Sequence, residues 1–318
     1  MYFSVGLSFQ GGKPSKATIN KEDCIHFLVI EEKNIGLFQP KKDACDICTA
    51  YDTGNLSQEE KETHDSMEKE ARMEKEKDKM LENEIFTMDL QSILLCPKSN
   101  VSSLYYKTKL IVHNFTVYDL KIKNGFCFLW NETEGRNTTL SNALLNLSIN
   151  SNVTIIQKFL QRGHTQMEVD SMHSTIERKV RNRKINVPAD YISICKSACI
   201  KSPYTVEYLT HNFFKSYSSI TFCKSIRPRN KKGDPIVTNL KVIKYELDRQ
   251  IKYKLRFTEE DWSTLKLKNS KQIAVKFDEL PQLHNDRLKI KKEKYEHLQQ
   301  LKLTMEKYYH AFFDNLPK

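Results

Sequence analysis

Apolar residues recur along the chain in short runs that are typical of β-strands. Three such runs, at 85–96, 104–118 and 126–130, are rich in β-branched and aromatic residues, which suit the pleated, half-buried surface of a sheet. The third run follows Asn124-Gly125, a dipeptide that favours the tight turn of a β-hairpin. The three runs therefore predict an antiparallel meander.

The hydrophobic pattern becomes helical after residue 138. Residues 139–147 have the apolar spacing of a helix, the continuous apolar run 153–160 predicts a buried strand, and a second helix is expected to begin near Glu168 or Val169. Three strands, a helix, a strand and a helix predict an α+β fold. This order makes up most of a ribonuclease-H-like layout, in which helices flank a mixed sheet.

Acidic residues stand at the two places where such a layout holds divalent metal, the first strand and the closing helix. Asp89 interrupts the first apolar run, and Asp170, His173 and Glu177 share one face of the closing helix at spacing i, i+3 and i+7. A buried Asp89 would be costly without a cation or hydrogen-bond donors. We expect Asp89 to approach this helix, with Asp89, Glu168, Asp170 and His173 as candidate catalytic residues and Asp89 and Asp170 as ligands of a divalent ion. The alternative is an ordinary helix start, where the helix dipole favours carboxylates and the histidine is solvated.

A Cys-x-x-Cys pair, Cys45 and Cys48, follows a Pro-Lys-Lys turn. Two cysteines at this spacing are half of a zinc site. His64 is the expected third ligand, and the fourth position is open to Cys24 or His26. The alternative is a pair of free thiols, because the eight cysteines are scattered as in a protein that is kept reduced inside a cell.

Residues 57–84 are almost wholly charged, with both signs at close spacing. Helix formers in this pattern predict a solvated helix that is stabilised by i,i+4 ion pairs such as Glu68 with Arg72. We expect a spacer or an arm with no chemistry of its own.

Positive charge is concentrated late in the chain. Of the net charge of +11, residues 224–318 contribute a surplus of 10, from 23 Lys and Arg against 13 Asp and Glu. This balance favours partners that carry phosphate, and we expect residues 224–318 to carry most of the affinity for nucleic acid. The candidate contacts lie in two clusters, Arg178, Lys179, Arg181, Arg183 and Lys184 at the end of the closing helix, and Arg227, Arg229, Lys231 and Lys232 in a turn-rich linker. The first cluster has a second interpretation, because cations are favoured at any helix C-terminus.

The last third of the chain also has predicted secondary structure. Two strand-like runs lie within 237–257, and apolar residues recur near helical spacing at 286–313. The second pattern predicts one basic amphipathic helix. That helix could dock on the core, pair with a copy of itself or lie along nucleic acid.

Several motifs carry a resemblance to a known family. They are Phe86-Thr87-Met88-Asp89-Leu90-Gln91, Lys107-Thr108-Lys109-Leu110 with His113-Asn114-Phe115-Thr116, and the stretch from Gly163 to Asp170. These motifs resemble a family of insect and other animal proteins that derive from transposable elements. The similarity runs from about Ile35 to Pro317 and includes 40–48 and 187–191. The family is similar to transposases with a ribonuclease-H-like core and three acidic residues, so the resemblance implies an ancestor that used magnesium or manganese.

The chain departs from the family pattern after the third strand. Similar proteins continue with a helix and another strand, which presents the second acid. Here only eight residues lie between Trp130 and Thr139, too few for a helix and a strand. We therefore expect the second acidic strand to be absent and the core to be incomplete.

These patterns predict four segments: a cysteine-bearing segment at 1–56, a charged helical arm at 57–84, a ribonuclease-H-like core at 85–223, and a basic unit of strands and a helix at 224–318. The expected function is that of a transposon-derived nucleic-acid-binding protein whose metal-dependent core is degenerate and inactive. One alternative is an active nuclease that recruits Glu132 or Glu134 as a substitute acid. Another is a protein-interaction module that uses the arm and the tail helix, with self-association through that helix.

No stretch of the sequence is long and apolar enough to cross a bilayer. The start of the chain has no secretory pattern. We therefore expect an intracellular, nuclear protein that has nucleic acid and not a membrane as its partner.

Overall fold

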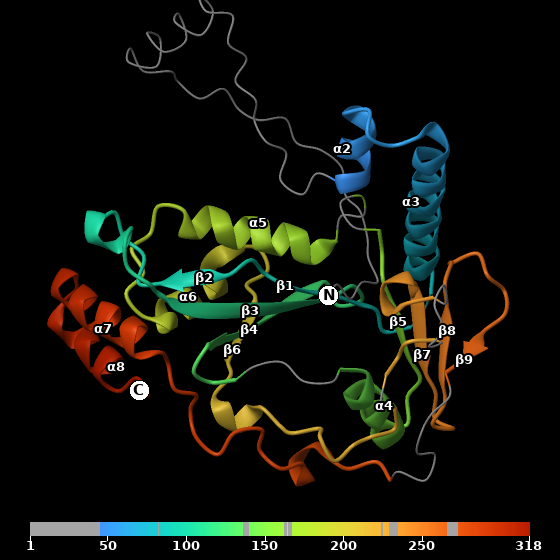
Figure 1. Ribbon diagram of the computed structural model, residues 1–318. Coiled ribbons are helices and arrows are strands. Elements are labelled where there is room, and N and C mark those ends of the chain that lie inside the picture. The colour runs from blue at the N-terminus through green and yellow to red at the C-terminus, as the bar shows by residue number, and fades with distance from the viewer. Residues whose placement is uncertain are drawn as a thin grey trace, which may run out of the picture.

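The computed structural model of the chain describes residues 45–318 apart from 82, 136–139, 162–163, 165–166, 224, 229–234 and 266–272. In this part of the chain, strands form two β-sheets (Figure 1). The first sheet consists of β1 (Phe86–Leu90), β2 (Leu94–Cys96), β3 (Leu110–Asp119), β4 (Asn124–Asn131) and β6 (Thr205–Tyr208). The second consists of β5 (Ile155–Lys158), β7 (Val242–Tyr245), β8 (Ile251–Lys254) and β9 (Ser263–Thr264).

The first sheet contains the predicted antiparallel meander. The single strand expected at 85–96 is two strands, β1 and β2, separated by residues 91–93. Both pair antiparallel with β3, and β3 pairs antiparallel with β4. In this register Asp89 lies opposite Thr116. β6, which the sequence pattern did not predict as a strand, pairs parallel with β4.

Two helices pack against the first sheet and a third helix belongs to the second. α5 (Glu168–Val180) contacts β1 and β3, and α6 (Pro188–Ala198) contacts β4 and β6. α4 (Leu140–Ser151) packs on β5 and β7. The predicted starts of α4 and α5 are confirmed to within one or two residues.

The mixed α+β architecture with flanking helices is therefore confirmed. The finer ribonuclease-H-like assignment stays a prediction, because β5 does not extend the first sheet. It pairs antiparallel with β7 in the second sheet, and among the described strands β1 pairs with β3 alone.

Two hydrophobic cores lie under the two sheets, and both cross the predicted boundary at 223/224. The first core unites residues of the first sheet, α5 and α6 with Leu298, Leu301 and Phe313 of the C-terminal segment. The second joins Leu145 on α4 with residues of β7 and β8. Residues 224–318 therefore do not form a separate unit.

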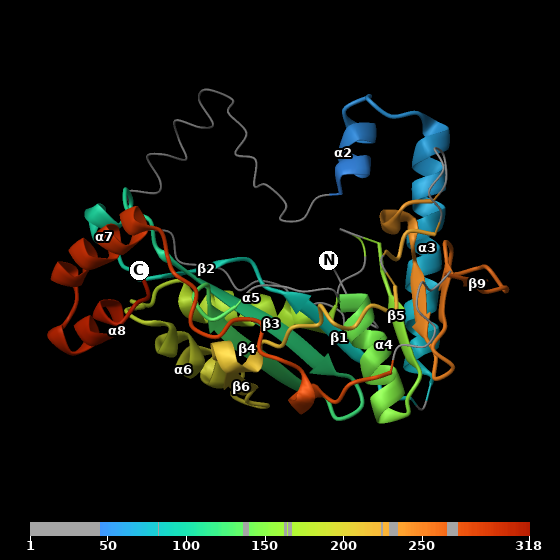
Figure 2. The same ribbon diagram turned by 60° about the horizontal axis from the view of Figure 1, so that its bottom comes forward.

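The charged segment forms α3 (Gln58–Lys79), a helix of 22 residues that begins with a capping box of Ser57 and Glu60. The predicted Glu68–Arg72 ion pair is present. The expectation of a solvated spacer is wrong, because α3 lies along the second sheet in both views (Figure 2). Its buried face consists of His64, Ala71, Lys75 and Asp78, and ion pairs replace apolar contacts there.

Those ion pairs join α3 to the second sheet. Lys158 on β5 lies 2.7 Å from Glu74 and also pairs with Asp78. Arg256 after β8 pairs with Glu70. The sequence predicted a charged helix correctly, but its charges are matched by cations that are distant in the sequence.

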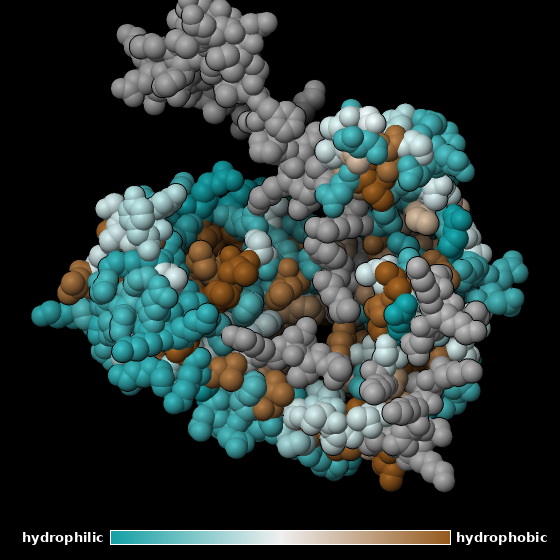
Figure 3. Space-filling view, in the orientation of Figure 1, coloured by the Kyte–Doolittle hydropathy of each residue, from teal (hydrophilic) through white to brown (hydrophobic). Residues whose placement is uncertain are grey.

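The C-terminal segment forms two short helices and not the single helix predicted at 286–313. α7 (Lys292–Leu301) and α8 (His310–Asp314) are separated by turns of 3-10 helix. Both dock on the first core, and their outer surface, at the left of Figure 3, is mostly hydrophilic apart from a small apolar patch. Of the three uses that the sequence left open, the structure contains docking on the core.

The described helices include none that is long and apolar enough to span a membrane.

Candidate metal centres

The start of α5 places two carboxylates at the end of a buried helix face. Met167 has an extended backbone and caps α5, and its N–H donates to Asp170 Oδ2 at 2.7 Å. The helix dipole favours carboxylates in this first turn. The face toward the sheet is apolar and consists of Val169, Met172, Ile176 and Val180, together with His173.

Asp89, Asp170 and His173 meet where α5 crosses β1 and β3. One potential ligand atom from each lies within 4.8 Å of the other two. Asp89 is only 8% exposed, and its Oδ1 accepts from the N–H of Leu90 at 2.8 Å. The expected approach of the first strand to this helix is therefore observed.

Hydrogen bonds orient the His173 ring. Thr116 Oγ1 lies 3.2 Å from the backbone oxygen of Asp89 and 2.6 Å from His173 Nε2. The hydroxyl has one proton, so it donates either to the Asp89 oxygen or to His173 Nε2. In both tautomers the contact occupies Nε2, and Nδ1 is the ring nitrogen without this partner. Burial lowers the pKa of His173 to about 4, against a smaller opposite effect of Glu177, so the ring is neutral at physiological pH.

This donor set fits one divalent ion. Two carboxylates and an imidazole suit manganese or zinc better than magnesium, which prefers oxygen ligands alone. Two-metal phosphoryl transfer needs carboxylates around cations about 3.5–4 Å apart. In the part of the chain that the structure describes, no further carboxylate joins this group. Residues present here could therefore bind and polarise one ligand but do not surround two ions.

A lysine from the charged helix stands beside the acids. Lys75 on α3 is 4% exposed. Burial lowers its pKa, and the nearby carboxylates of Glu168 and Asp170 act in the opposite direction. A buried ammonium near these carboxylates offsets part of the negative charge that would attract a metal cation.

The other acids that the sequence suggested lie elsewhere. Glu168 is close enough to influence Lys75 but does not belong to the group of Asp89, Asp170 and His173. Glu132 accepts from the N–H of Ile111 and pairs with Lys294 at 2.7 Å. Glu134 lies 3.2 Å from Arg287. The two proposed substitute acids are thus bound to the C-terminal segment.

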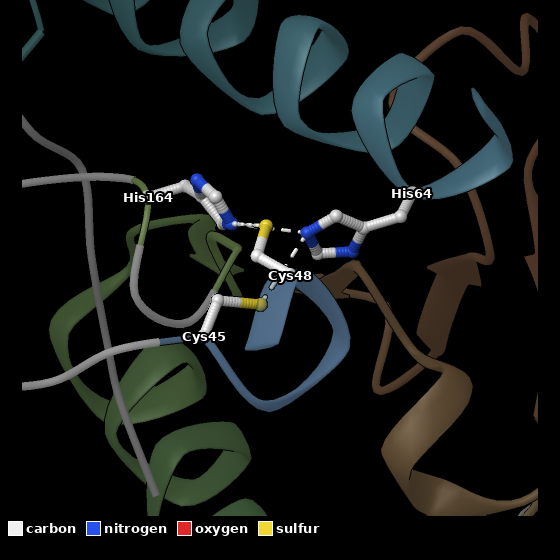
Figure 4. A group of neighbouring side chains, drawn as sticks. All are labelled: Cys45, Cys48, His64 and His164. Atoms are coloured by element: carbon white, nitrogen blue, oxygen red, sulfur yellow. Dashed lines mark hydrogen bonds between the residues drawn. The ribbon is translucent and has the colours of Figure 1, made fainter. Parts of the chain in front are cut away.

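A second group of potential metal ligands joins His164, which precedes α5, with residues of α2 (Asp46–Asp52) and α3. Cys45 and Cys48 at the start of α2, His64 on α3 and His164 point toward one another (Figure 4). Their ligand atoms all lie within 4.8 Å of each other. Cys45 Sγ is 3.4 Å from His64 Nε2, Cys48 Sγ is 3.3 Å from His164 Nε2, and the two Nε2 atoms are 2.9 Å apart.

The outer nitrogens of both rings have partners as well. His164 Nδ1 lies 2.9 Å from a carboxylate oxygen of Glu68, and the side-chain amide of Gln161 lies 3.4 Å from His64 Nδ1. A carboxylate on Nδ1 fixes the tautomer whose Nε2 carries the lone pair. The His164 ring is therefore oriented to bind a cation through Nε2.

Close packing in this group shifts the pKa values of Cys48 and His64. Burial raises the pKa of the Cys48 thiol, and the hydrogen bond and charge of Cys45 raise it further, against a smaller effect of Lys61. Burial also lowers the pKa of His64, with His164 acting in the same direction. A thiol that loses its proton only with difficulty can still be ionised by a metal ion, which takes the place of the proton.

The sequence predicted three of these four residues. Cys24 and His26, the suggested fourth ligands, lie outside the described residues, and His164 occupies the fourth position. His164 is 100 residues from His64, and no spacing rule covers such a distance. Lys75 was also missed, although its place on one helical face with His64, Ala71 and Asp78 could have been read from their spacing.

Most of the predicted cations at the end of α5 are exposed. We call Arg178, Lys179, Arg181, Arg183 and Lys184 the basic end of α5. Lys179 is half-buried and the other four are exposed; Lys184 pairs with Glu306 at 3.0 Å. Lys98 adds a cation by donating to the carbonyl of Val180 at 2.5 Å. In the linker Arg227 is exposed, whereas Arg229, Lys231 and Lys232 lie outside the described residues.

No protein-family model, curated protein or solved structure matches the chain. The resemblance to transposable-element-derived proteins therefore stays a prediction that rests on the motifs quoted above.

Proposed function

We propose that the chain binds nucleic acid through the basic end of α5, on a transposase-like core that has lost its cleavage activity. The observation that carries this proposal is the arrangement of charge along α5. The helix has 13 residues, so its acidic first turn and its basic end are about 20 Å apart. A nucleic-acid backbone that lies on the basic end and continues along α5 would reach the acid group.

The cations at this end are available for phosphates. Within the described part of the chain, ion pairs bind Lys184 but not Arg178, Lys179, Arg181 or Arg183. Exposed arginines and lysines that the fold does not neutralise are the groups that contact phosphate in nucleic-acid complexes. The terminal position on a helix favours the same cations for the helix dipole, so the test below has to measure binding and not only stability.

The tail contributes fewer available charges than its composition suggests. Several of its cations form ion pairs within the fold, namely Arg256 with Glu70, Arg287 with Glu134, Lys294 with Glu132 and Lys302 with Asp314. Charges that are neutralised in this way release few counterions from nucleic acid. For this reason the proposal assigns the main contact to α5 and not to residues 224–318.

The proposed loss of cleavage is supported by the composition of the acid group. Asp89 and Asp170 are its two carboxylates, with His173 as third ligand and Lys75 nearby. Such a group can hold one ion but lacks the acid that would complete a two-metal centre. The core would then serve as a platform for binding.

A matched pair of charge variants tests the binding surface. In the first, Arg178, Lys179, Arg181 and Arg183 are changed to Gln. In the second, four exposed tail residues, Lys289, Lys291, Lys292 and Lys307, are changed to Gln, which removes the same charge. Truncation at Cys223 is unsuitable because it would remove part of both cores. Binding of a fluorescent DNA duplex is measured at several salt concentrations, and circular dichroism verifies folding.

The first variant should lose affinity and make the salt dependence of log K less steep by about 3–4, since each phosphate contact contributes about 0.9. The tail variant should change the slope by less than about 1. Equal losses in both variants would refute a specific role of α5. Absence of salt-dependent binding by the unmodified chain would favour a protein-interaction module instead.

A further inference from the structure

We infer that Cys45, Cys48, His64 and His164 bind one structural zinc ion, and that this ion fixes the start of α5. The site joins three stretches of chain: the start of α2, the first half of α3 and the residues ahead of α5 (Figure 4). The inference does not depend on nucleic-acid binding.

Three distances between the ligand atoms are slightly shorter than the edges of a tetrahedral zinc site. With zinc bonds of about 2.3 Å to sulfur and about 2.05 Å to nitrogen, tetrahedral edges are about 3.6 Å for sulfur to nitrogen and about 3.3 Å for nitrogen to nitrogen. The two observed sulfur–nitrogen distances are 3.4 and 3.3 Å, and the nitrogen–nitrogen distance is 2.9 Å. A central ion would require the four side chains to separate by a few tenths of an ångström.

The chemistry of the donors selects the metal. Two thiolates and two imidazoles in a closed tetrahedral arrangement are typical of structural zinc, whereas magnesium and calcium prefer oxygen. Glu68 supplies the carboxylate that commonly supports a zinc-bound histidine from behind. The donor set is complete, so no ligand position is left for water.

A smaller group, His64 with Asp65 and Glu68, overlaps this site. It is a poorer candidate, because Asp65 is exposed and pairs with Lys61. Glu68 is bound to His164 and to Arg72. Assigning His64 to the Cys-His group leaves both acids with their present partners.

The environment of α2 supports a role in stability. This helix of 7 residues has no buried residue. A short helix without an apolar anchor is marginal in water, and its position against α3 needs another source of free energy. Bonds from a metal ion to Cys45 and Cys48 would supply that free energy.

The same ion would restrain the acid group. His164 precedes Asp170 by six residues, and α3 carries both the ligand His64 and the buried Lys75. With His164 and His64 held by one ion, the residues ahead of α5 are tied to α3, the helix that also carries Lys75 beside the acids. Loss of the ion should therefore loosen the first turn of α5.

Zinc content and hydrogen exchange test the two parts of the inference. The full chain, purified without added metal and dialysed, should retain one zinc per chain by elemental analysis. Cys48→Ser should lose it, whereas Cys199→Ser, at a half-buried cysteine outside the group, should keep it. If Cys48→Ser does not fold, a chelator applied to the unmodified chain gives the same comparison. No bound zinc, or equal retention by both variants, would overturn the inference.

Glu68→Gln isolates the supporting carboxylate without removing a ligand. It should weaken zinc binding about 10- to 100-fold in a chelator competition. The control Glu62→Gln, at an exposed residue of the same helix, should leave zinc affinity unchanged. Equal affinities for the two variants would contradict the assigned role of Glu68.

Amide hydrogen exchange tests whether the bound ion restrains the start of α5. When zinc is removed from the unmodified chain, amide exchange in peptides covering 167–175 should accelerate, while β3 and β4 stay protected. Unchanged exchange at 167–175 would show that the ion, even if bound, does not fix the start of α5.

Discussion

Two groups of potential metal ligands share the stretch of ten residues from His164 to His173. They differ in the number of ligands that each offers to one ion. The Cys-His group has four ligands of the kind that encloses zinc. The acid group of Asp89, Asp170 and His173 has three, of the kind that leaves positions open. One stretch of chain therefore carries a closed site, suited to stability, beside an open site, suited to binding or chemistry.

The helix α3 places side chains of opposite charge beside the two groups. It places Glu68 on the outer nitrogen of His164, where a negative charge supports a bound cation. About two turns later it places Lys75 near Glu168 and Asp170, where a positive charge opposes a bound cation. From this comparison we expect neighbouring charges, as well as the ligands themselves, to determine which group retains metal.

The largest expected effect concerns the ion pairs that attach α3 to the second sheet. α3 contributes His64 to the Cys-His group and places Lys75 beside the acid group. Lys158→Ala would leave Asp78, which is 3% exposed, without its cation. A buried charge that loses its partner costs about 3–5 kcal/mol of unfolding free energy. Urea unfolding at constant zinc measures this loss.

The matched control for Lys158 is Lys61→Ala, which breaks an exposed pair with Asp65. It should change the unfolding free energy much less than Lys158→Ala does, because solvent screens an exposed pair. Similar effects of the two substitutions would show that the ion pairs to β5 do not hold α3.

The next effect is a dependence of stability on pH that comes from the acid group. The pKa of His173 is lowered from 6.5 to about 4 in the folded chain, so the unfolded chain binds the proton more tightly. This contribution to stability is fully present above pH of about 6.5 and is lost as the pH falls toward about 4, by up to about 3 kcal/mol.

Substituting His173→Gln should flatten the unfolding free energy over that pH range. Measurements in chelator separate this effect from metal release. A profile with the same slope in the variant would mean that His173 is not the titrating group.

A smaller effect should appear when the lysine beside the acids is neutralised. Lys75→Met removes a buried positive charge, so the affinity of the acid group for manganese should rise by about tenfold, on the order of 1.4 kcal/mol. Calorimetric titration with manganese in zinc-loaded protein measures the change. The exposed Lys69→Met on the same helix serves as control, and equal affinities in the two variants would contradict the opposing role of Lys75.

The smallest expected signal is DNA cleavage, which should be absent. With two carboxylates in the acid group, the chain should not cleave or join plasmid or oligonucleotide DNA in magnesium or manganese, because loose catalytic geometry alone can cost about a hundredfold. Asp89→Asn controls for contaminating nuclease. Cleavage that disappears in Asp89→Asn would show that the acid group is still catalytic.

The sequence predicted the parts of this molecule that depend on local patterns. The strands around Asp89 and the start of α5 have short-range signals, and both were located correctly. The Cys45–Cys48 pair also has a short-range signal, and its role as a zinc site stays a prediction. The approach of Asp89 to Asp170 followed from the order of elements. His164 could not be assigned, because its role arises from contacts with residues far away in the chain. The buried position of Lys75 could have been read from its helical spacing, but not its approach to Glu168 and Asp170.

The second sheet was unpredictable for the same reason. Residues 153–160 have the composition of a buried strand, which identifies β5 but not its partner. The partner, β7, begins at Val242, and pairing across that separation leaves no pattern in either segment. The charged composition of α3 likewise concealed a buried face, since its buried Asp78 is matched by Lys158 and not by an apolar neighbour.

X-ray absorption at the zinc edge, on the full chain loaded with one equivalent of zinc, tests the central comparison most directly. The account predicts two sulfur neighbours at about 2.3 Å and two nitrogen neighbours at about 2.0–2.1 Å, from Cys45, Cys48, His64 and His164. A shell of nitrogen and oxygen alone at about 2.0–2.2 Å would place the ion at Asp89, Asp170 and His173. That result would contradict the claim that the closed site, and not the open one, retains the metal.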